Sequence, residues 1–308
     1  MTGEDFKLAL PDHPGQLRWS ASAFKITESS VKPNGREIGI RAANESGRLT
    51  FLGFLFLFPE QAPITSVKCR DGVLEPAKKA NPKLRILGTS EKSVSGSPPI
   101  SLVSYVAEGS GGKPIYSVRG FIAAGDICGD LEFYSDAAIS ADDNELKTIF
   151  ATYRLDENYV PQFGDAFLYA QMLYKKRLYK AAAPIFEIAL AKLKADAGPE
   201  AKKMRRVTTD QAGMAYGISG DLAKARAIFQ QAIKEDPDYP MYYYNLACAD
   251  AEEKKLADAR VHLQQAFARK ANVIAGEKMP DPTRDDSFLP YRDNKDFWTF
   301  LKSLNADL

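Results

Sequence analysis

Histidine and cysteine are scarce in this sequence of 308 residues, which narrows the chemistry that it can support. Its two histidines, His13 and His262, come without a Gly-x-Ser-x-Gly elbow, the turn that presents a nucleophilic serine in many hydrolases. No two of its three cysteines are close enough for a Cys-x-x-Cys site that binds zinc or exchanges thiols. We therefore expect no catalytic residues, no bound metal and no cofactor.

The three cysteines, Cys69, Cys128 and Cys248, leave several arrangements open. All three could be reduced and mostly buried, as free cysteines commonly are. Cys69 and Cys128 lie in the same half of the chain and could pair in an oxidising compartment, which would leave Cys248 unpaired. Cys128 could also lie beside His13, although a structural role is more common for each of these residues.

Long apolar runs and an excess of one charge are also missing. The net charge is +1, which gives no general attraction to nucleic acid. The apolar stretch Leu49–Phe58 has only strand length, well short of the roughly 18 residues of a membrane span. Residues Met1–Asp5 lack a basic start and an apolar region, so we expect a cytoplasmic protein as written. The alternative is a periplasmic or secreted protein whose leader was removed.

Alternation of apolar and polar residues, typical of strands, dominates residues 6–155. It predicts strands at Phe6–Leu10, Phe24–Val31, Glu37–Ala42, Leu49–Phe58, Leu84–Ser90, Ile100–Ala107, Ile115–Ala123 and Ile127–Tyr134. Helices are predicted at Thr65–Lys79 and Ala141–Tyr153, the second with Ser140 as its N-cap. The first half is therefore α+β, with a mostly antiparallel sheet and two helices, and Leu49–Phe58 is its central strand, buried on both faces.

Glycine-rich turns separate these strands. Asn34-Gly35 between two extended runs is a strong signal for a hairpin. Gly109–Lys113 has some glycines of a phosphate-binding loop. However, Ala107 and Pro114 occupy the positions where that motif needs glycine and a hydroxyl residue. The segment predicts a hairpin turn instead.

The order of elements in the first half resembles the PsbP-like α/β/α sandwich, the fold of the extrinsic photosystem II P subunits. The resemblance rests on the opening strand Phe6–Pro11, the paired strands Ile115–Ala123 and Ile127–Tyr134, and the helix that ends in Thr152-Tyr153-Arg154. That fold mainly serves binding and assembly, so the resemblance implies no active site.

Small and apolar residues recur with a period of 34 in the second half (259 − 225 = 34). The matched sets are Ala225, Phe229 and Ala232, then Ala259, Leu263 and Ala266. An earlier set, Ala182, Phe186 and Ala189, precedes them by 43 residues (225 − 182 = 43), which predicts a long turn within Lys194–Arg206. A period of 34 is typical of helix–turn–helix repeats. The pattern resembles the tetratricopeptide (TPR) family.

This resemblance implies an all-α array of three helical hairpins, at about 164–197, 207–240 and 241–274. We expect two domains, an α+β sandwich over residues 1–157 and the repeats with a cap over residues 158–308. The cap is expected at Phe288–Asp293 and Phe297–Leu301, where an aromatic residue would cover the exposed end of the last repeat, as after bacterial arrays.

In this family the first helix of each repeat lines a concave groove that binds peptides or helices. The resemblance assigns this groove to Phe167, Gln171, Tyr174, Lys175, Asp210, Met214, Ile218, Tyr244, Cys248, Ala251 and Glu252. The Lys/Asn clamp of the chaperone-binding members is not reproduced, because Asp210/Met214 and Tyr244/Cys248 stand at its positions. These residues could instead pack against the N-terminal domain, which would leave no free groove.

Two charged clusters have both a functional and a structural interpretation. Lys202–Arg206 could hold an acidic partner or a phosphate, but Glu200 and Asp210 flank it, as on a solvated helix start or loop. Cys69-Arg70-Asp71 could belong to a ligand site, and a buried Arg–Asp ion pair explains it equally well.

We expect a non-enzymatic scaffold or adaptor that binds a protein or peptide partner and is a monomer or weak homo-oligomer. The alternative is a small-ligand binder or enzyme with its site in the N-terminal sheet and the repeats as a buttress. That alternative predicts a deep polar pocket near Cys69, Arg70, Asp71 and Cys128.

Overall fold

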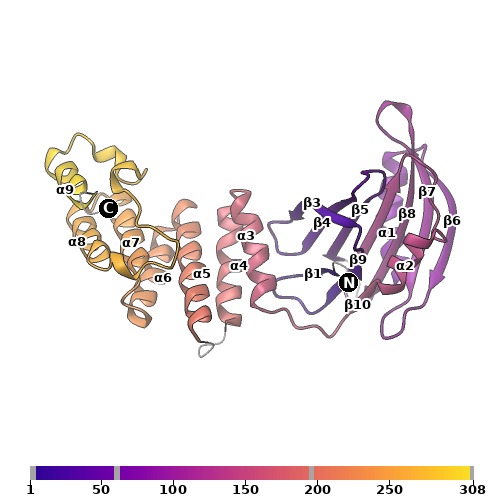
Figure 1. The fold of residues 1–308 in the computed structure, drawn as a ribbon, viewed down its shortest axis with the longest axis horizontal. Coiled ribbons are helices and arrows are strands. Elements are labelled where there is room, and N and C mark those ends of the chain that lie inside the picture. The colour runs from indigo at the N-terminus through magenta and orange to yellow at the C-terminus, as the bar shows by residue number, and fades with distance from the viewer. Residues whose placement is uncertain (1–4, 59–62, 194–197, 306–308) are drawn as a thin grey trace. The chain divides into compact units, whose positions relative to one another are not determined.

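A computed structural model describes residues 5–58, 63–193 and 198–305. The chain divides into two compact units, Met1–Leu173 and Tyr174–Leu308 (Figure 1). The division falls inside helix α3 (Phe163–Lys175), whereas the predicted domain boundary precedes that helix. Within the described ranges, no helix is long and apolar enough to cross a membrane.

The first unit contains two antiparallel sheets. The larger one has seven strands in the order β3 (Phe24–Val31), β4 (Glu37–Asn44), β5 (Thr50–Leu57), β9 (Ile127–Ser135), β8 (Pro114–Ala124), β7 (Ile100–Glu108) and β6 (Arg85–Lys92). The smaller one has the order β1 (Asp5–Ala9), β2 (Gln16–Ser20) and β10 (Arg154–Asp156). The α+β class is confirmed, with antiparallel sheets followed by helices.

Strands β2 and β10 are absent from the sequence-based expectation. Each is short, with five and three residues, and each contributes few apolar side chains to a pattern. Their pairing is decided by contact between residues far apart in the chain, such as Leu17 with Leu155. The prediction that the strand at Leu49–Phe58, which is β5 in the structure, is buried on both faces is wrong. Leu52, Phe54 and Phe56 are only half-buried, and they lie on one face.

Aromatic rings fill the space between the two sheets. The Trp19 ring from β2 lies 5.5 Å from Phe51 of β5, and Phe133 of β9 lies 5.6 Å from Phe150. Gly53 leaves room for this packing, because a Cβ atom there would come within 2.6 Å of the Trp19 ring. Helix α2 (Asn144–Thr152) carries Phe150 on this same face.

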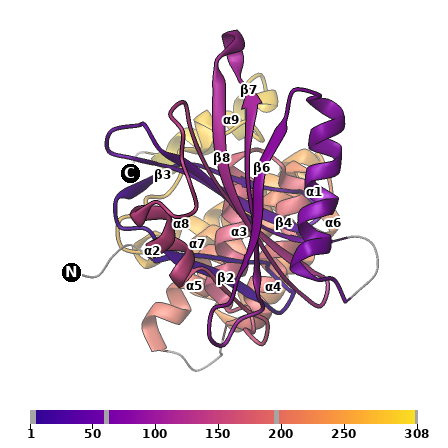
Figure 2. The same ribbon diagram turned by 90° about the vertical axis from the view of Figure 1, so that its right-hand side faces the viewer.

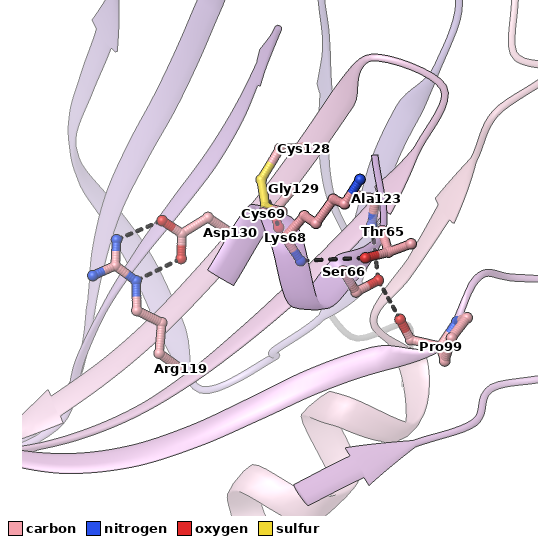
Figure 3. The surroundings of a disulfide bond; sticks show 10 residues. All are labelled: Thr65, Ser66, Lys68, Cys69, Pro99, Arg119, Ala123, Cys128, Gly129 and Asp130. Atoms are coloured by element: carbon pink, nitrogen blue, oxygen red, sulfur yellow. Dashed lines mark hydrogen bonds and ion pairs between the residues drawn. A yellow bond between two sulfur atoms is a disulfide. The ribbon is translucent and has the colours of Figure 1, made fainter. Parts of the chain in front are cut away.

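Helix α1 (Ser66–Ala80) covers part of the opposite face of the large sheet (Figure 2). The Thr65 side chain caps it by accepting a hydrogen bond from the Lys68 amide at 3.2 Å. Ser66 fixes its start, because its hydroxyl donates to Pro99 O and accepts from the Ala123 amide (Figure 3).

A disulfide bond joins Cys69 of α1 to Cys128 of β9, with 6.0 Å between their Cα atoms. Both residues are fully buried in an apolar cluster that includes Leu74 and Phe121. Of the arrangements that the sequence leaves open, the structure selects this pair and leaves Cys248 free. A Cys128–His13 pair is excluded, because the Cys128 sulfur is bonded.

The second unit is an array of helical hairpins (Figure 1). Its helices are α4 (Tyr179–Lys192), α5 (Gly198–Ile218), α6 (Leu222–Glu235), α7 (Pro240–Glu252) and α8 (Leu256–Phe267). Ala225 and Ala259 are almost fully buried, as the close approach of paired helices requires. The period of 34 thus corresponds to the step from α6 to α8.

The long turn predicted within Lys194–Arg206 is wrong from residue 198 onward, and residues 194–197 lie outside the described ranges. Residues 198–206 form the first turns of α5, which has 21 residues. Contacts with the turn between α6 and α7 stabilise this extension: Arg206 forms two hydrogen bonds with Asp236, at 2.6 and 3.0 Å, and its guanidinium lies over the Tyr239 ring.

The C-terminal segment caps the array. After α8 the chain forms short 3-10 turns at Lys270–Asn272, Pro282–Arg284 and Leu289–Tyr291, and then helix α9 (Lys295–Asn305). Phe288 and Phe297 are buried in the core cluster of the second unit. The predicted aromatic cap is therefore present, with Phe288 and Phe297 rather than the half-buried Trp298 at its centre.

Candidate interaction surface

An open cleft of about 700 Å³ lies in the second unit between α5, α6, α7 and the loop Arg284–Ser287. Four predicted groove residues line it: Met214, Ile218, Cys248 and Glu252. They come together because α5 and α7 are the first helices of successive hairpins and pack side by side. We call this space the cleft.

One wall of the cleft is apolar. Met214 is half-buried and Ile218 is 54% exposed, so both side chains present apolar surface to the cleft. Phe229 of α6 lies behind them and is buried against Gly213. This wall therefore offers apolar surface that a partner side chain could cover.

The other wall is acidic. Glu252 at the end of α7 and Asp286 in the loop are both exposed, and Asp285 of the same loop is hydrogen-bonded to Tyr244 of α7. Burial raises the pKa of the Cys248 thiol well above its usual value, and the nearby negative charge of Asp285 adds to the shift. A thiol with a raised pKa is a poor nucleophile, so this wall suits electrostatic binding better than covalent chemistry.

The C-terminal segment covers part of the face on which the cleft lies. The Tyr244 hydroxyl donates to Asp285 at 3.0 Å, and the Tyr244 ring packs edge-on against Phe288 at 6.1 Å. The Tyr291 hydroxyl donates to the carbonyl oxygen of Ala251 at 2.5 Å. Tyr244 is thus buried beneath the C-terminal segment, and the cleft is what this segment leaves open.

Asp210 lies beside the cleft in a polar cluster. Asn245 donates to its carboxylate at 2.5 Å. The pKa of Asp210 is raised to about 7, mainly by burial and also by the negative charge of Glu277, whereas the Asn245 hydrogen bond opposes the shift. Glu277 itself accepts from the Tyr239 hydroxyl at 2.9 Å.

The remaining predicted groove residues are on α3. Phe167 and Gln171 belong to the first unit, where the neighbouring Tyr169 hydroxyl donates to Lys32 O and Glu37 O at 2.7 Å. Tyr174 and Lys175 belong to the second unit. There the Tyr174 ring packs edge-on against Tyr179 at 4.9 Å, and Lys175 is exposed.

The sequence pattern did not predict that the loop Arg284–Ser287 lines the cleft or that Glu277 lies near Asp210. The signal that could have found them is the acidic run between residues 277 and 286. Whether that run would lie over the last repeat depends on how the C-terminal segment folds back onto α7, which no local pattern reveals.

The histidines are engaged in pairs with carboxylates. His262 Nδ1 lies 2.5 Å from Asp250, which also accepts from Arg226, and His13 Nε2 lies 3.0 Å from Asp126. The part of the chain that the structure describes contains no group of three or more His, Cys, Asp or Glu residues placed to hold a metal ion.

The two charged clusters have structural contacts. In Lys202–Arg206, Lys202 and Arg206 both pair with Asp236. Arg70 lies 2.8 Å from the exposed Asp71 and donates to Ser101 at 3.0 Å. The Cys69–Cys128 bond beside Arg70 is enclosed by apolar side chains.

No protein-family model and no curated protein matches this sequence. Among solved structures, a protein from Bacteroides thetaiotaomicron VPI-5482 is similar with 12% identity, over 71% of this chain and 80% of its own, at a TM-score of 0.35. A multi-domain immunophilin from Arabidopsis thaliana is similar with 11% identity, over 86% of this chain and 98% of its own, at a TM-score of 0.30. Likeness at this level carries no argument about function. The PsbP-like resemblance stays a prediction.

Proposed function

We propose that this protein is a non-enzymatic scaffold or adaptor that binds a protein or peptide partner in the cleft of its second unit. The observation that carries the proposal is the exposed Ile218 beside Met214, on the inner face of a helical-hairpin array. Exposed apolar side chains gathered in a concave site favour binding of a partner.

The alternative, a ligand site in the N-terminal sheet near the Cys69–Cys128 bond, gains less support. Both cysteines are fully buried in the apolar cluster, and Arg70 is engaged by Asp71 and Ser101. These surroundings resemble a packed core more than a polar pocket. We therefore favour the binding function over an enzyme.

Partner capture with two matched variants tests the proposal. Ile218→Ser removes apolar surface inside the cleft, whereas Val261→Ser removes a similarly exposed side chain, 50% exposed on α8, outside it. We expect the wild type and Val261→Ser to retain the same partner from a lysate of the source cells. Ile218→Ser should weaken its binding by about tenfold, since such a contact contributes roughly 1–2 kcal/mol. Equal retention by all three proteins would rule out the cleft.

The disulfide bond bears on location. Bonds of this kind form and persist in oxidising compartments such as the periplasm or the extracellular space. Of the two locations that the sequence leaves open, we propose the periplasmic or secreted one. Mass spectrometry of the protein from its source cells, before and after reduction, tests this, because the bonded form is lighter by two hydrogens. A reduced pair in freshly isolated protein would contradict it.

A further inference from the structure

The acidic wall of the cleft has little compensating positive charge. Arg284 is the one basic residue among the described residues that line the cleft, against the three carboxylates of Glu252, Asp285 and Asp286. Among the described residues 5–58, 63–193 and 198–305, no ion pair joins Glu252 or Asp286 to a cation. The lining therefore has a net charge of −2 (one positive, three negative).

Asp285 is held in place by neutral groups. It accepts hydrogen bonds from the Tyr244 hydroxyl at 3.0 Å and from the Ser287 amide at 3.0 Å. Such bonds orient a carboxylate without cancelling its charge. Asp285 is thus a fixed negative group at the edge of the cleft, supported by the packing of Phe288 against Tyr244.

The apolar and acidic walls face the same space. Met214 and Ile218 belong to the last turns of α5, and Glu252 belongs to the last turn of α7. A bound segment would therefore meet aliphatic side chains on one side and carboxylates on the other. An aliphatic stem that ends in a positive charge, as in lysine or arginine, has this combination of properties.

We propose that the cleft binds an extended peptide segment of its partner that carries a lysine or arginine, with the cation against Glu252, Asp285 and Asp286 and an apolar neighbour against Met214 and Ile218. This inference rests on the proposed function and adds the chemistry of the partner. An acidic segment is disfavoured, because like charges would oppose its entry.

Selection from a library of random short peptides tests the charge preference without assuming a sequence. The immobilised full-length protein is used at low salt and again at high salt. We expect the selected peptides to be enriched in lysine and arginine and depleted in aspartate and glutamate. Their affinity should fall by about threefold to tenfold from low to high salt, because the carboxylates at the cleft edge are exposed to screening.

Three variants locate the effect. Glu252→Gln and Asp286→Asn should each weaken the best basic peptide by about threefold, as expected for one partly exposed charge pair. Asp238→Asn removes an exposed negative charge in the turn before α7, at the opposite end of that helix from Glu252, and should leave the affinity unchanged. Fluorescence anisotropy with the labelled peptide measures all four dissociation constants.

The outcomes separate this inference from the proposed function. Selected peptides with no basic preference, or with an acidic one, would overturn the inference and leave peptide binding intact. Basic peptides whose affinity is equally unaffected by Glu252→Gln and Asp286→Asn would also overturn it, because their site would then lie elsewhere. If the library yields no binding peptide at all, both the inference and the peptide-binding form of the proposed function are wrong.

Discussion

Asp210 is a buried carboxyl group whose ionisation makes the stability of the second unit depend on pH. It lies between Asn245 of α7 and the negative Glu277 of the C-terminal segment, with the Tyr239 hydroxyl donating to Glu277. Burial is the main reason that the pKa of Asp210 rises to about 7. Because the folded chain holds this proton more tightly than the unfolded chain does, the folded state loses stability as the proton is released.

The pH dependence of this residue is testable. Between about pH 4, where aspartate ionises in an unfolded chain, and pH 7, where it ionises in the folded protein, rising pH should destabilise the second unit. Asp210→Asn keeps an acceptor for Asn245 and removes the ionisation. It should raise the free energy of unfolding at pH 8 by about 2 kcal/mol and have a smaller effect at pH 5.

Urea unfolding at pH 5 and pH 8 measures this difference. Asp238→Asn, at the exposed turn before α7, provides the matched control and should follow the wild type at both values. A stability gain for Asp210→Asn that is equal at pH 5 and pH 8 would show that ionisation is not its cause.

At the scale of one helix, α5 combines two glycines with different surroundings. Gly213 faces α6, where an added Cβ would overlap the Phe229 ring. Gly217 lies one turn further on, and an added Cβ there would approach only the Ala225 Cβ, at 3.8 Å, which is an ordinary contact. Both residues have the same intrinsic cost in a helix, so their difference isolates packing between α5 and α6.

Replacing each glycine with alanine tests this packing. Gly213→Ala should lower the free energy of unfolding by about 1–2 kcal/mol, because the forced shift of the buried Phe229 outweighs the gain in helix propensity. Gly217→Ala should raise it by about 0.5–1 kcal/mol, because only the propensity changes. Circular dichroism during chemical unfolding measures both variants. A stabilised Gly213→Ala protein would show that α5 and α6 are packed less closely than described.

At the scale of the whole molecule, the chain combines two units that are stabilised in different ways. The first contains a disulfide between α1 and β9, which closes a loop with a sequence separation of 59 residues. The second has a free cysteine and depends on aromatic and aliphatic packing around α7 and the cap. A reducing agent should therefore act on one unit only.

Calorimetry with and without a reducing agent tests this separation. The Cys69→Ala/Cys128→Ala protein, or the reduced wild type, should lose about 2–4 kcal/mol of stability in the transition of the first unit. The second transition should stay where it is. If reduction lowers both transitions equally, the two units do not unfold independently.

The strands were predictable where a turn signal follows an extended run, as in β3, whose bounds Phe24–Val31 match the expectation and which precedes Asn34-Gly35. Helix boundaries were less predictable. The predicted N-cap of α2, Ser140, is wrong, and Asp143 takes that place, because the Ser140 amide instead donates to the Asp143 carboxylate at 2.9 Å. Local sequence patterns predict the presence of helices and strands well. They predict poorly which of several polar residues will cap a helix.

The predicted groove residues also include some whose place follows from local pattern and one whose place does not. The repeat register assigned Met214, Ile218, Cys248 and Glu252 to one surface, and all four line one cleft. The register could do so because helical periodicity sets which residues share a face. The burial of Tyr244 was not predictable, since it depends on Asp285 and Phe288, some 40 residues later (285 − 244 = 41).

The sequence alone determined the elements and their repetition: antiparallel strands in the first half, helices with a period of 34 in the second, and an aromatic segment after them. These follow from local periodicity and from small residues at fixed spacing. Only the tertiary structure decided that Cys69 pairs with Cys128, that α5 extends back to Gly198, and that the C-terminal segment covers part of the concave face. Each of these features depends on contacts between residues distant in sequence, which local pattern and propensity do not encode.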